Sequence, residues 1–174
     1  MRRDVDDERI RELLRRLGRR VSEPTTCYLS GGATAILYGW RATSRDVDMR
    51  FEPDRDEIFD AVRELKEQLQ TNIEFASPVD FIPMPDGWRD RSPMVAREGE
   101  LTVRHLDPRA QALAKVERWH PLDREDVAAM LDRGLVTADE LRAAFDEIAP
   151  QLVRFPAIDV SRFRSHLDAA TGRP

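Results

Sequence analysis

Several residue types and patterns are scarce in this chain of 174 residues. Cys27 is the only cysteine, and lysine occurs only at positions 66 and 115. A single thiol cannot close an internal disulfide or supply the cysteine ligands of a structural zinc site. No apolar run approaches the ~20 residues that cross a bilayer as a helix, and the N-terminus is too charged for a signal peptide. We therefore expect a cytoplasmic protein with no membrane partner.

The remaining composition is that of a globular protein. Apolar residues make up 41% of the chain and charged residues 35%, which is ordinary for a compact domain. The net charge of −5 argues against a protein that coats nucleic acid through charge alone. A chain of this length forms one core, or one core with a helical appendage.

Hydrophobic periodicity predicts an α/β part over residues 1–106. Apolar residues at helical spacing predict a helix over residues 6–20. They predict a second helix that has Asp54 as its N-cap and runs to about residue 70. A shorter helix over 33–38 follows a glycine pair. Residues 83–97 contain three prolines and are predicted to form a loop. Strands are predicted over residues 25–30, 46–51, 72–76, 78–82 and 101–105.

The rest of the chain, residues 107–174, is predicted to be a helical region packed on this core. Asp107-Pro108 is an N-cap followed by proline at the first helical position, which predicts a helix to about Trp119. Thr137 and Glu140 form a capping-box sequence that opens another helix, to about residue 148. Further helices are predicted over residues 123–133 and 161–169.

Asp46 and Asp48 are the first candidate site residues. They alternate with Val47, Met49 and Phe51, so both carboxylates project from one face of a strand, with Cα atoms about 7 Å apart. Carboxylate oxygens are the ligands that Mg²⁺ prefers, and two Mg²⁺ ions ~4 Å apart can clamp a reacting phosphate. Asp80 is predicted to supply a third carboxylate from a neighbouring strand, either as a ligand or as a general base.

Other residues suit the binding of a triphosphate. Ser30, Gly31 and Gly32 precede a predicted helix, where glycines let the backbone approach a phosphate closely and the first N–H groups face the anion. On a later helix, Lys115 and Arg118 share one face and suit the β- and γ-phosphates, and Asp126 is placed to orient Lys115.

Each of these features also has a structural explanation when it is taken alone. An isolated Asp-x-Asp is usually surface charge, a Gly-Gly pair is usually a turn, and Lys115 with Arg118 suits a solvated helix face. The order along the chain favours the functional interpretation: glycine turn, helix, Asp-x-Asp strand and then a further acidic segment.

The stretch from Ser30 to Thr43, followed by Asp46-Val47-Asp48, resembles the signature of the DNA polymerase β-like nucleotidyltransferase superfamily. It is most similar to the small bacterial branch that includes AbiEii and MenT-type toxins, in which a lysine-bearing helix and an Asp-rich helix follow the core. Residues 113–118 and 123–127 match those helices loosely. The resemblance implies a mixed sheet flanked by helices, with Mg²⁺ on Asp46 and Asp48 and a nucleoside triphosphate held by Ser30 and Lys115, the latter supported by Asp126.

The implied activity is transfer of a nucleoside monophosphate from a nucleoside triphosphate to an acceptor hydroxyl, with release of pyrophosphate. The toxin-like branch points to RNA, including a tRNA 3′ end, as the acceptor. A hydroxyl on a protein or small molecule is an alternative acceptor. A different class of function also remains open: a non-catalytic nucleotide-binding module that acts as one half of a toxin–antitoxin pair.

Overall fold

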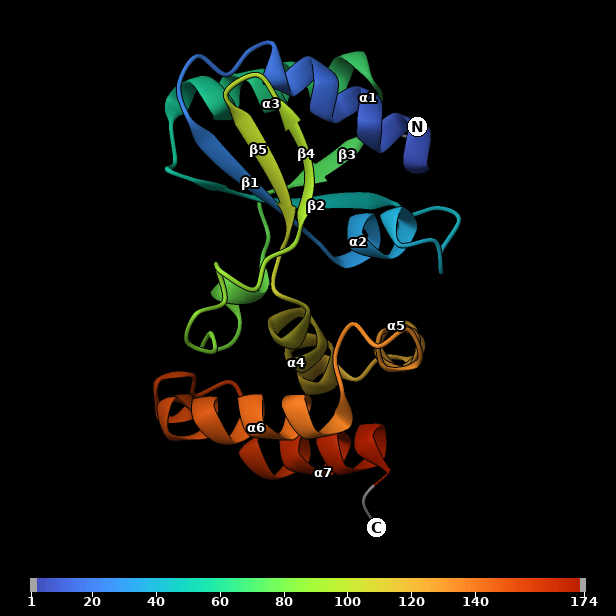
Figure 1. Cartoon of the computed structure of the whole chain (residues 1–174), viewed down its shortest axis with the longest axis vertical. Coiled ribbons are helices and arrows are strands. Elements are labelled where there is room, and N and C mark those ends of the chain that lie inside the picture. The colour runs from blue at the N-terminus through green and yellow to red at the C-terminus, as the bar shows by residue number, and fades with distance from the viewer. Residues whose placement is uncertain (1–2, 173–174) are drawn as a thin grey trace. The chain divides into compact units, whose positions relative to one another are not determined.

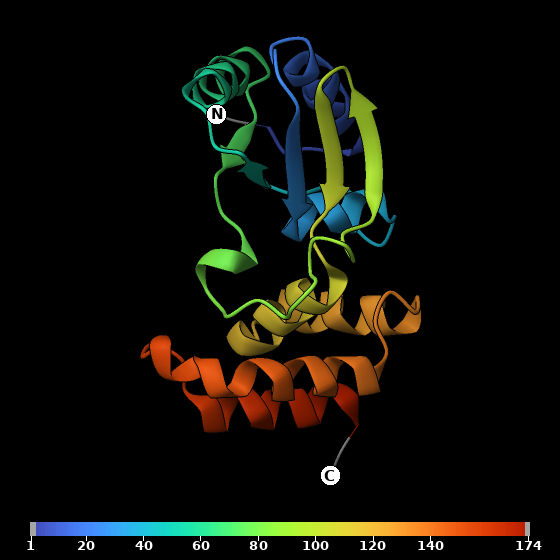
Figure 2. The same ribbon diagram turned by 60° about the vertical axis from the view of Figure 1, so that its left-hand side comes forward.

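The computed structural model describes residues 3–172 and shows a mixed α/β protein (Figures 1 and 2), as the sequence predicts. The chain forms two compact units. The first unit contains residues 3–77 and 92–106, and the second contains residues 78–91 and 107–172. The short segment 78–91 therefore belongs to the helical unit, although it lies between strands in the sequence.

The first unit is built on a five-stranded sheet of order β3-β2-β1-β5-β4. The central strand β1 pairs antiparallel with β2 and parallel with β5; β3 then adds parallel to β2, and β4 antiparallel to β5. The strands are β1 (Thr25–Ser30), β2 (Asp46–Glu52), β3 (Asn72–Glu74), β4 (Met94–Glu98) and β5 (Leu101–His105).

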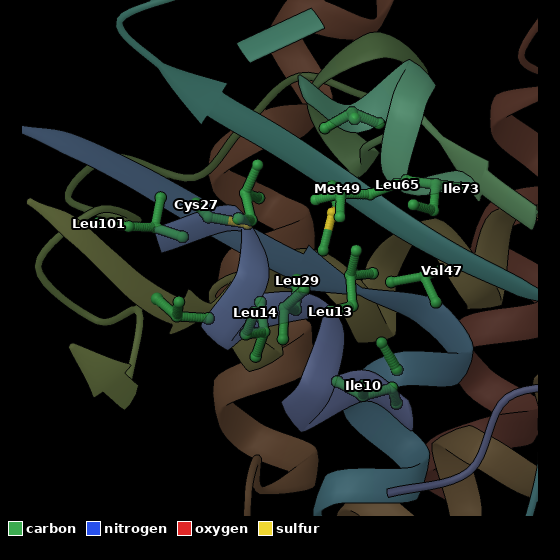
Figure 3. Close-up of a cluster of buried hydrophobic side chains, with 14 of the residues drawn as sticks. Ile10, Leu13, Leu14, Cys27, Leu29, Val47, Met49, Leu65, Ile73 and Leu101 are labelled. Carbon is green, nitrogen blue, oxygen red and sulfur yellow. The ribbon is translucent and has the colours of Figure 1, made fainter. Parts of the chain in front are cut away.

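Helices α1 (Asp7–Gly18), α2 (Gly31–Leu37) and α3 (Asp56–Gln68) complete this unit. The apolar stripes of α1 and α3 pack with one face of the sheet, where Leu13 and Leu65 join Leu29 and Met49 in a continuous buried cluster (Figure 3). Cys27 lies inside the same cluster, and its burial raises the pKa of the thiol. The core thus fixes one face of β1 and β2 and leaves the other face to polar side chains.

Strand β2 shows this division residue by residue. Val47, Met49 and Phe51 are buried in the core, whereas the residues between them are only half-buried. A pleated strand places alternate side chains on opposite faces, so Asp46 and Asp48 share the face turned away from the core. The predicted strand with one acidic face is confirmed.

The second unit consists of helices and two short 3₁₀ segments. Asp107 caps α4 by accepting a hydrogen bond from the backbone N–H of Arg109 at 3.0 Å, and the predicted capping box opens α6 through Thr137 and Glu140. Helices α6 and α7 lie side by side, with the rings of Phe145 and Phe163 edge to face. The elements are η1 (Pro78–Asp80), α4 (Pro108–Arg118), α5 (Pro121–Asp132), α6 (Ala138–Ile148), η2 (Ala149–Arg154) and α7 (Val160–Thr171).

Some predicted elements are wrong or displaced. Residues 78–82 do not form a strand: the N–H groups of Phe81 and Ile82 both donate to the carbonyl of Pro78 at 3.0 Å, which closes the tight turn η1. Strand β4 begins inside the predicted loop over 83–97. Three helix starts also shift: α2 begins at Gly31 instead of Ala33, Arg55 replaces Asp54 as the N-cap of α3, and α5 begins at Pro121 instead of Asp123.

Candidate functional site

The turn from β1 into α2 lies directly beside Asp48. Ser30, the last residue of β1, is the register partner of Asp48 on β2. Gly31 follows with φ = +59°, and a Cβ atom at this position would overlap the Oδ2 atom of Asp48. Residues with a side chain rarely adopt this φ, and a Cβ atom here would force the Asp48 carboxylate to move, so glycine is favoured at this position. The sequence prediction that joined this turn to the Asp-x-Asp strand therefore corresponds to a direct contact.

Gly32 is required for a related reason. A Cβ atom at Gly32 would overlap the side chain of Ser44, whose Oγ accepts a hydrogen bond from the backbone N–H of Asp46 at 3.4 Å. Ser44 is itself held by backbone hydrogen bonds in both directions with Val5. The glycine pair thus lets the start of α2 approach the start of β2 closely, a packing role that exists alongside any contact with phosphate.

The neighbouring strand β3 extends the acidic face, which we define as Asp46, Asp48, Asn72 and Glu74. In the parallel pairing of β2 and β3, Asn72 lies opposite Asp46 and Glu74 lies opposite Asp48. The Nδ2 group of Asn72 donates to Oδ1 of Asp46 and, at 3.0 Å, to Oε1 of Glu74. Sequence reasoning missed both β3 residues. The available signal was the alternation of Asn72 and Glu74 around the buried Ile73, after a helix that follows β2.

Asp80, the predicted third carboxylate, lies at the end of η1 in the second unit, where it is exposed. The strand that was expected to carry it does not exist, so the geometric reason for choosing it is lost. Its role as a ligand or base stays a prediction. Across residues 3–172, the side chains as they lie do not gather three or more acidic, histidine or cysteine groups into a cluster suited to a metal ion.

A buried ion pair occupies the second unit. The Nζ of Lys115 on α4 donates to Oδ2 of Asp126 on α5 at 2.6 Å, and both side chains are almost fully buried. Arg118, one turn later, is half-exposed and pairs with Asp123 at 2.7 Å. The expected contact between Lys115 and Asp126 is present, although Lys115 does not lie on a solvated face. The role of these residues in binding a nucleotide stays a prediction.

The first unit also contains a buried histidine. His105, the last residue of β5, has its Nδ1 3.1 Å from the hydroxyl of Thr34, and its ring stacks on Tyr38 at 4.4 Å between centroids. Burial lowers the pKa of His105 from 6.5 to about 4, because the imidazolium cannot keep its hydration. The ring is therefore neutral at physiological pH and acts as part of the packing between β5 and α2.

Comparison with known families decides the class of the protein. Residues 6–161 match the model of the family described as "Nucleotidyltransferase of unknown function (DUF6036)". The chain belongs to this nucleotidyltransferase family. No curated protein and no solved structure gives a significant match. The resemblance to nucleotidyltransferases is thus confirmed at the level of the family, whereas the finer resemblance to the AbiEii and MenT branch stays a prediction.

The predicted site residues form two groups, each within one unit. Ser30, Gly31, Asp46 and Asp48 lie together on the first unit, and Lys115, Arg118 and Asp126 lie together on the second. Because the chain belongs to this nucleotidyltransferase family, nucleotidyl transfer is the general activity expected of it. Among the described residues, no helix is long and apolar enough to cross a membrane.

Proposed function

We propose that this nucleotidyltransferase moves a nucleoside monophosphate from a nucleoside triphosphate to an acceptor hydroxyl and requires Mg²⁺. The observation that carries the proposal is the contact between Gly31 and Asp48. It joins the turn that suits a phosphate to the strand that bears two carboxylates on one face. An anion-binding turn beside cation-binding carboxylates is the combination that a metal–triphosphate complex needs.

The residues of the acidic face fit Mg²⁺. Asp46 and Asp48 offer hard oxygen donors, and Glu74 adds a third carboxylate opposite Asp48. Mg²⁺ usually binds proteins through one or two carboxylates and completes its shell with water and substrate phosphates, so a full cluster of protein ligands is not needed. We propose Asp46 and Asp48 as the ligands of two ions. When bound, such ions neutralise the charge that builds on the attacking and leaving oxygens.

The proposed reaction is a single displacement at phosphorus. The acceptor oxygen forms a bond to the α-phosphorus, the bond from this phosphorus to the oxygen that bridges to the β-phosphate breaks, and pyrophosphate leaves with that electron pair. The proton of the acceptor hydroxyl must pass to a base. Asp80 is the base proposed from the sequence, and Glu74 is the carboxylate that the strand pairing adds as a candidate.

Two sets of residues, one within each unit, are candidates for contacts with phosphate, and each set is proposed by itself. Ser30, Gly31 and Gly32 are proposed to receive a phosphate at the start of α2. Lys115 and Arg118 are proposed to bind the β- and γ-phosphates, with Asp126 holding Lys115 in place. The Nζ of Lys115 donates to Asp126 and also lies 3.8 Å from Oδ1 of Asp123. An ammonium group has three N–H donors, and we propose that one of them binds phosphate when the triphosphate is present.

We propose RNA, including the 3′ end of tRNA, as the acceptor, on the basis of the resemblance to the toxin-like branch. A cognate antitoxin or toxin is then the expected protein partner. The alternative acceptors are a hydroxyl on a protein and one on a small molecule. All three acceptors use the same displacement at phosphorus, and labelled nucleotide separates them by the fraction in which the label appears.

The decisive experiment follows the label from each α-³²P nucleoside triphosphate. The purified chain is incubated with Mg²⁺ and with total RNA, a protein extract or a small-molecule fraction, and the products are separated by class. We expect label in RNA, pyrophosphate release, and loss of both on addition of EDTA. The matched control is Asp48→Ala, which removes one proposed ligand.

Each alternative has its own outcome in this experiment. Label in protein or in a small molecule would keep the nucleotidyl transfer and replace the acceptor. Label in no fraction, together with heat stabilisation of the chain by a nucleotide and Mg²⁺, would identify a non-catalytic nucleotide-binding module. Equal transfer by the wild type and by Asp48→Ala would refute the proposal that the carboxylate of Asp48 on the acidic face binds the metal ions used in transfer.

A further inference from the structure

Asn72 joins the two strands that carry the carboxylates. Its side-chain amide donates one hydrogen bond to Asp46 on β2 and a second, of 3.0 Å, to Glu74 on its own strand. The backbone register independently places Asn72 opposite Asp46 and Glu74 opposite Asp48. One neutral side chain therefore contacts two acidic groups of the proposed site.

The chemistry of the amide group fixes its orientation. A carboxylate only accepts hydrogen bonds, so the NH₂ group, which has two donors, must face the two carboxylates, and the amide oxygen must point elsewhere. Each of these bonds is charge-assisted and stronger than a bond between neutral groups. The amide thus draws two negative groups towards one point without adding a positive charge that would compete with a bound cation.

We propose that Asn72 is a positioning residue that holds the Asp46 carboxylate in the orientation required for cation binding and keeps Glu74 beside it. This inference rests on the proposed function. Asp46 keeps one carboxylate oxygen engaged by Asn72, so its rotation about the Cβ–Cγ bond is restricted and the orientation of its other oxygen is set. Hydrogen-bond partners of metal ligands act in this way, and their removal typically weakens metal binding 10- to 100-fold.

A purely structural role for Asn72 can be separated from this positioning role because β3 has another side-chain anchor. The Nζ of Lys66 on α3 donates to the backbone carbonyl of Ile73 at 3.1 Å. Lys66 therefore ties down the same three-residue strand without contacting a carboxylate of the acidic face. Lys66→Met removes this anchor, and it is the matched control for Asn72→Ala.

The test measures cation binding directly in the full chain. Mn²⁺ is titrated into the wild type, Asn72→Ala, Asn72→Gln and Lys66→Met, and the free ion is followed by its electron paramagnetic resonance signal. In parallel, the Mg²⁺ concentration that gives half-maximal transfer of label is measured. We expect Asn72→Ala to weaken Mn²⁺ binding and raise the Mg²⁺ requirement at least about 10-fold, and Asn72→Gln, which keeps the amide, to recover part of the loss. Lys66→Met is expected to match the wild type in both measurements.

Other results would overturn the inference in distinguishable ways. Wild-type Mn²⁺ binding and Mg²⁺ requirement in Asn72→Ala would show that Asn72 positions nothing, while the proposed function would stand. Equal losses in Asn72→Ala and Lys66→Met would assign both residues to the stability of β3. A wild-type chain that neither binds Mn²⁺ nor transfers label would overturn the proposed function and this inference together.

Discussion

Replacement of Gly31 by alanine tests the closest contact in the proposed site. Gly31 has φ = +59°, and a left-handed conformation costs a residue with a Cβ roughly 1–2 kcal/mol. The added Cβ would also overlap Oδ2 of Asp48, so the carboxylate must leave its preferred rotamer at a further cost of about 1 kcal/mol. We therefore expect Gly31→Ala to lower the free energy of unfolding by roughly 2–3 kcal/mol, measured by urea denaturation.

Gly39 provides the matched control for the backbone contribution. It also has a positive φ, +81°, but a Cβ atom there would meet nothing within 4 Å. Gly39→Ala should therefore cost only the roughly 1–2 kcal/mol of the backbone conformation. In an Asp48→Ala background the overlap is absent, so Gly31→Ala should cost about 1 kcal/mol less than it does in the wild type, and a double-mutant cycle measures this coupling.

The substitution should also reduce activity. Displacement of a reacting group by about 1 Å can reduce a rate about 100-fold, so Gly31→Ala should lose nucleotidyl transfer to this extent while it remains folded, and Gly39→Ala should retain it. If Gly31→Ala and Gly39→Ala have equal stability and the cycle shows no coupling, the reasoning is refuted, because Asp48 then does not lie against Gly31.

Three further predictions concern single groups. Asp48→Ala should abolish transfer while it changes the free energy of unfolding by less than ~1 kcal/mol, because the like-charged Glu74 lies directly opposite Asp48 on β3; a calorimetric scan and the label assay check both parts. Lys115→Ala should destabilise the chain by about 3–5 kcal/mol, because it removes the buried cation that pairs with Asp126 and lies 3.8 Å from Asp123. The combined change Lys115→Met with Asp126→Leu should recover stability but not the affinity for triphosphate, measured by equilibrium dialysis. The pKa of His105 is lowered from 6.5 to about 4 in the folded chain, so the unfolded chain binds the proton more readily and stability should fall by about 3 kcal/mol as the pH drops from 6.5 to 4. His105→Gln should remove this part of the pH dependence of the urea midpoint. If the urea midpoint of the variant falls with pH between 6.5 and 4 as steeply as that of the wild type, His105 is not the group responsible.

The elements that the sequence predicts correctly carry a local signal. Strand β2 alternates strictly between apolar and charged residues, and one buried face is enough to produce that alternation. The helix starts are also marked locally. Asp107 caps α4 with its side chain and Pro108 takes the first helical position, and Thr137 and Glu140 form the capping box of α6. In each of these elements, neighbours in the chain determine the structure, so no knowledge of the tertiary fold is needed.

The errors have two sources, one local and one distant along the chain. The apolar residues around Asp80 suggest a strand, but Pro78 has no N–H to give to a ladder, and its carbonyl closes a turn. Asn72 and Glu74 escaped prediction for a different reason. Only the parallel pairing of β3 with β2 reveals that they share a face with Asp46 and Asp48, and a sequence does not state which strands become neighbours.

The interleaving of the two units along the chain bears on any attempt to divide the protein. The backbone passes from one unit to the other after Ser77, again after Arg91 and a third time after Leu106. Segment 78–91 is joined to the helical unit by the ion pair of Arg91 with Asp107 and by a hydrogen bond from the Asp86 backbone to Glu147. A truncation at any one position therefore separates some residues from their own unit. A fragment of the first unit requires a short artificial loop in place of residues 78–91, and a fragment of the helical unit requires residues 78–91 to be joined to residues 107–172.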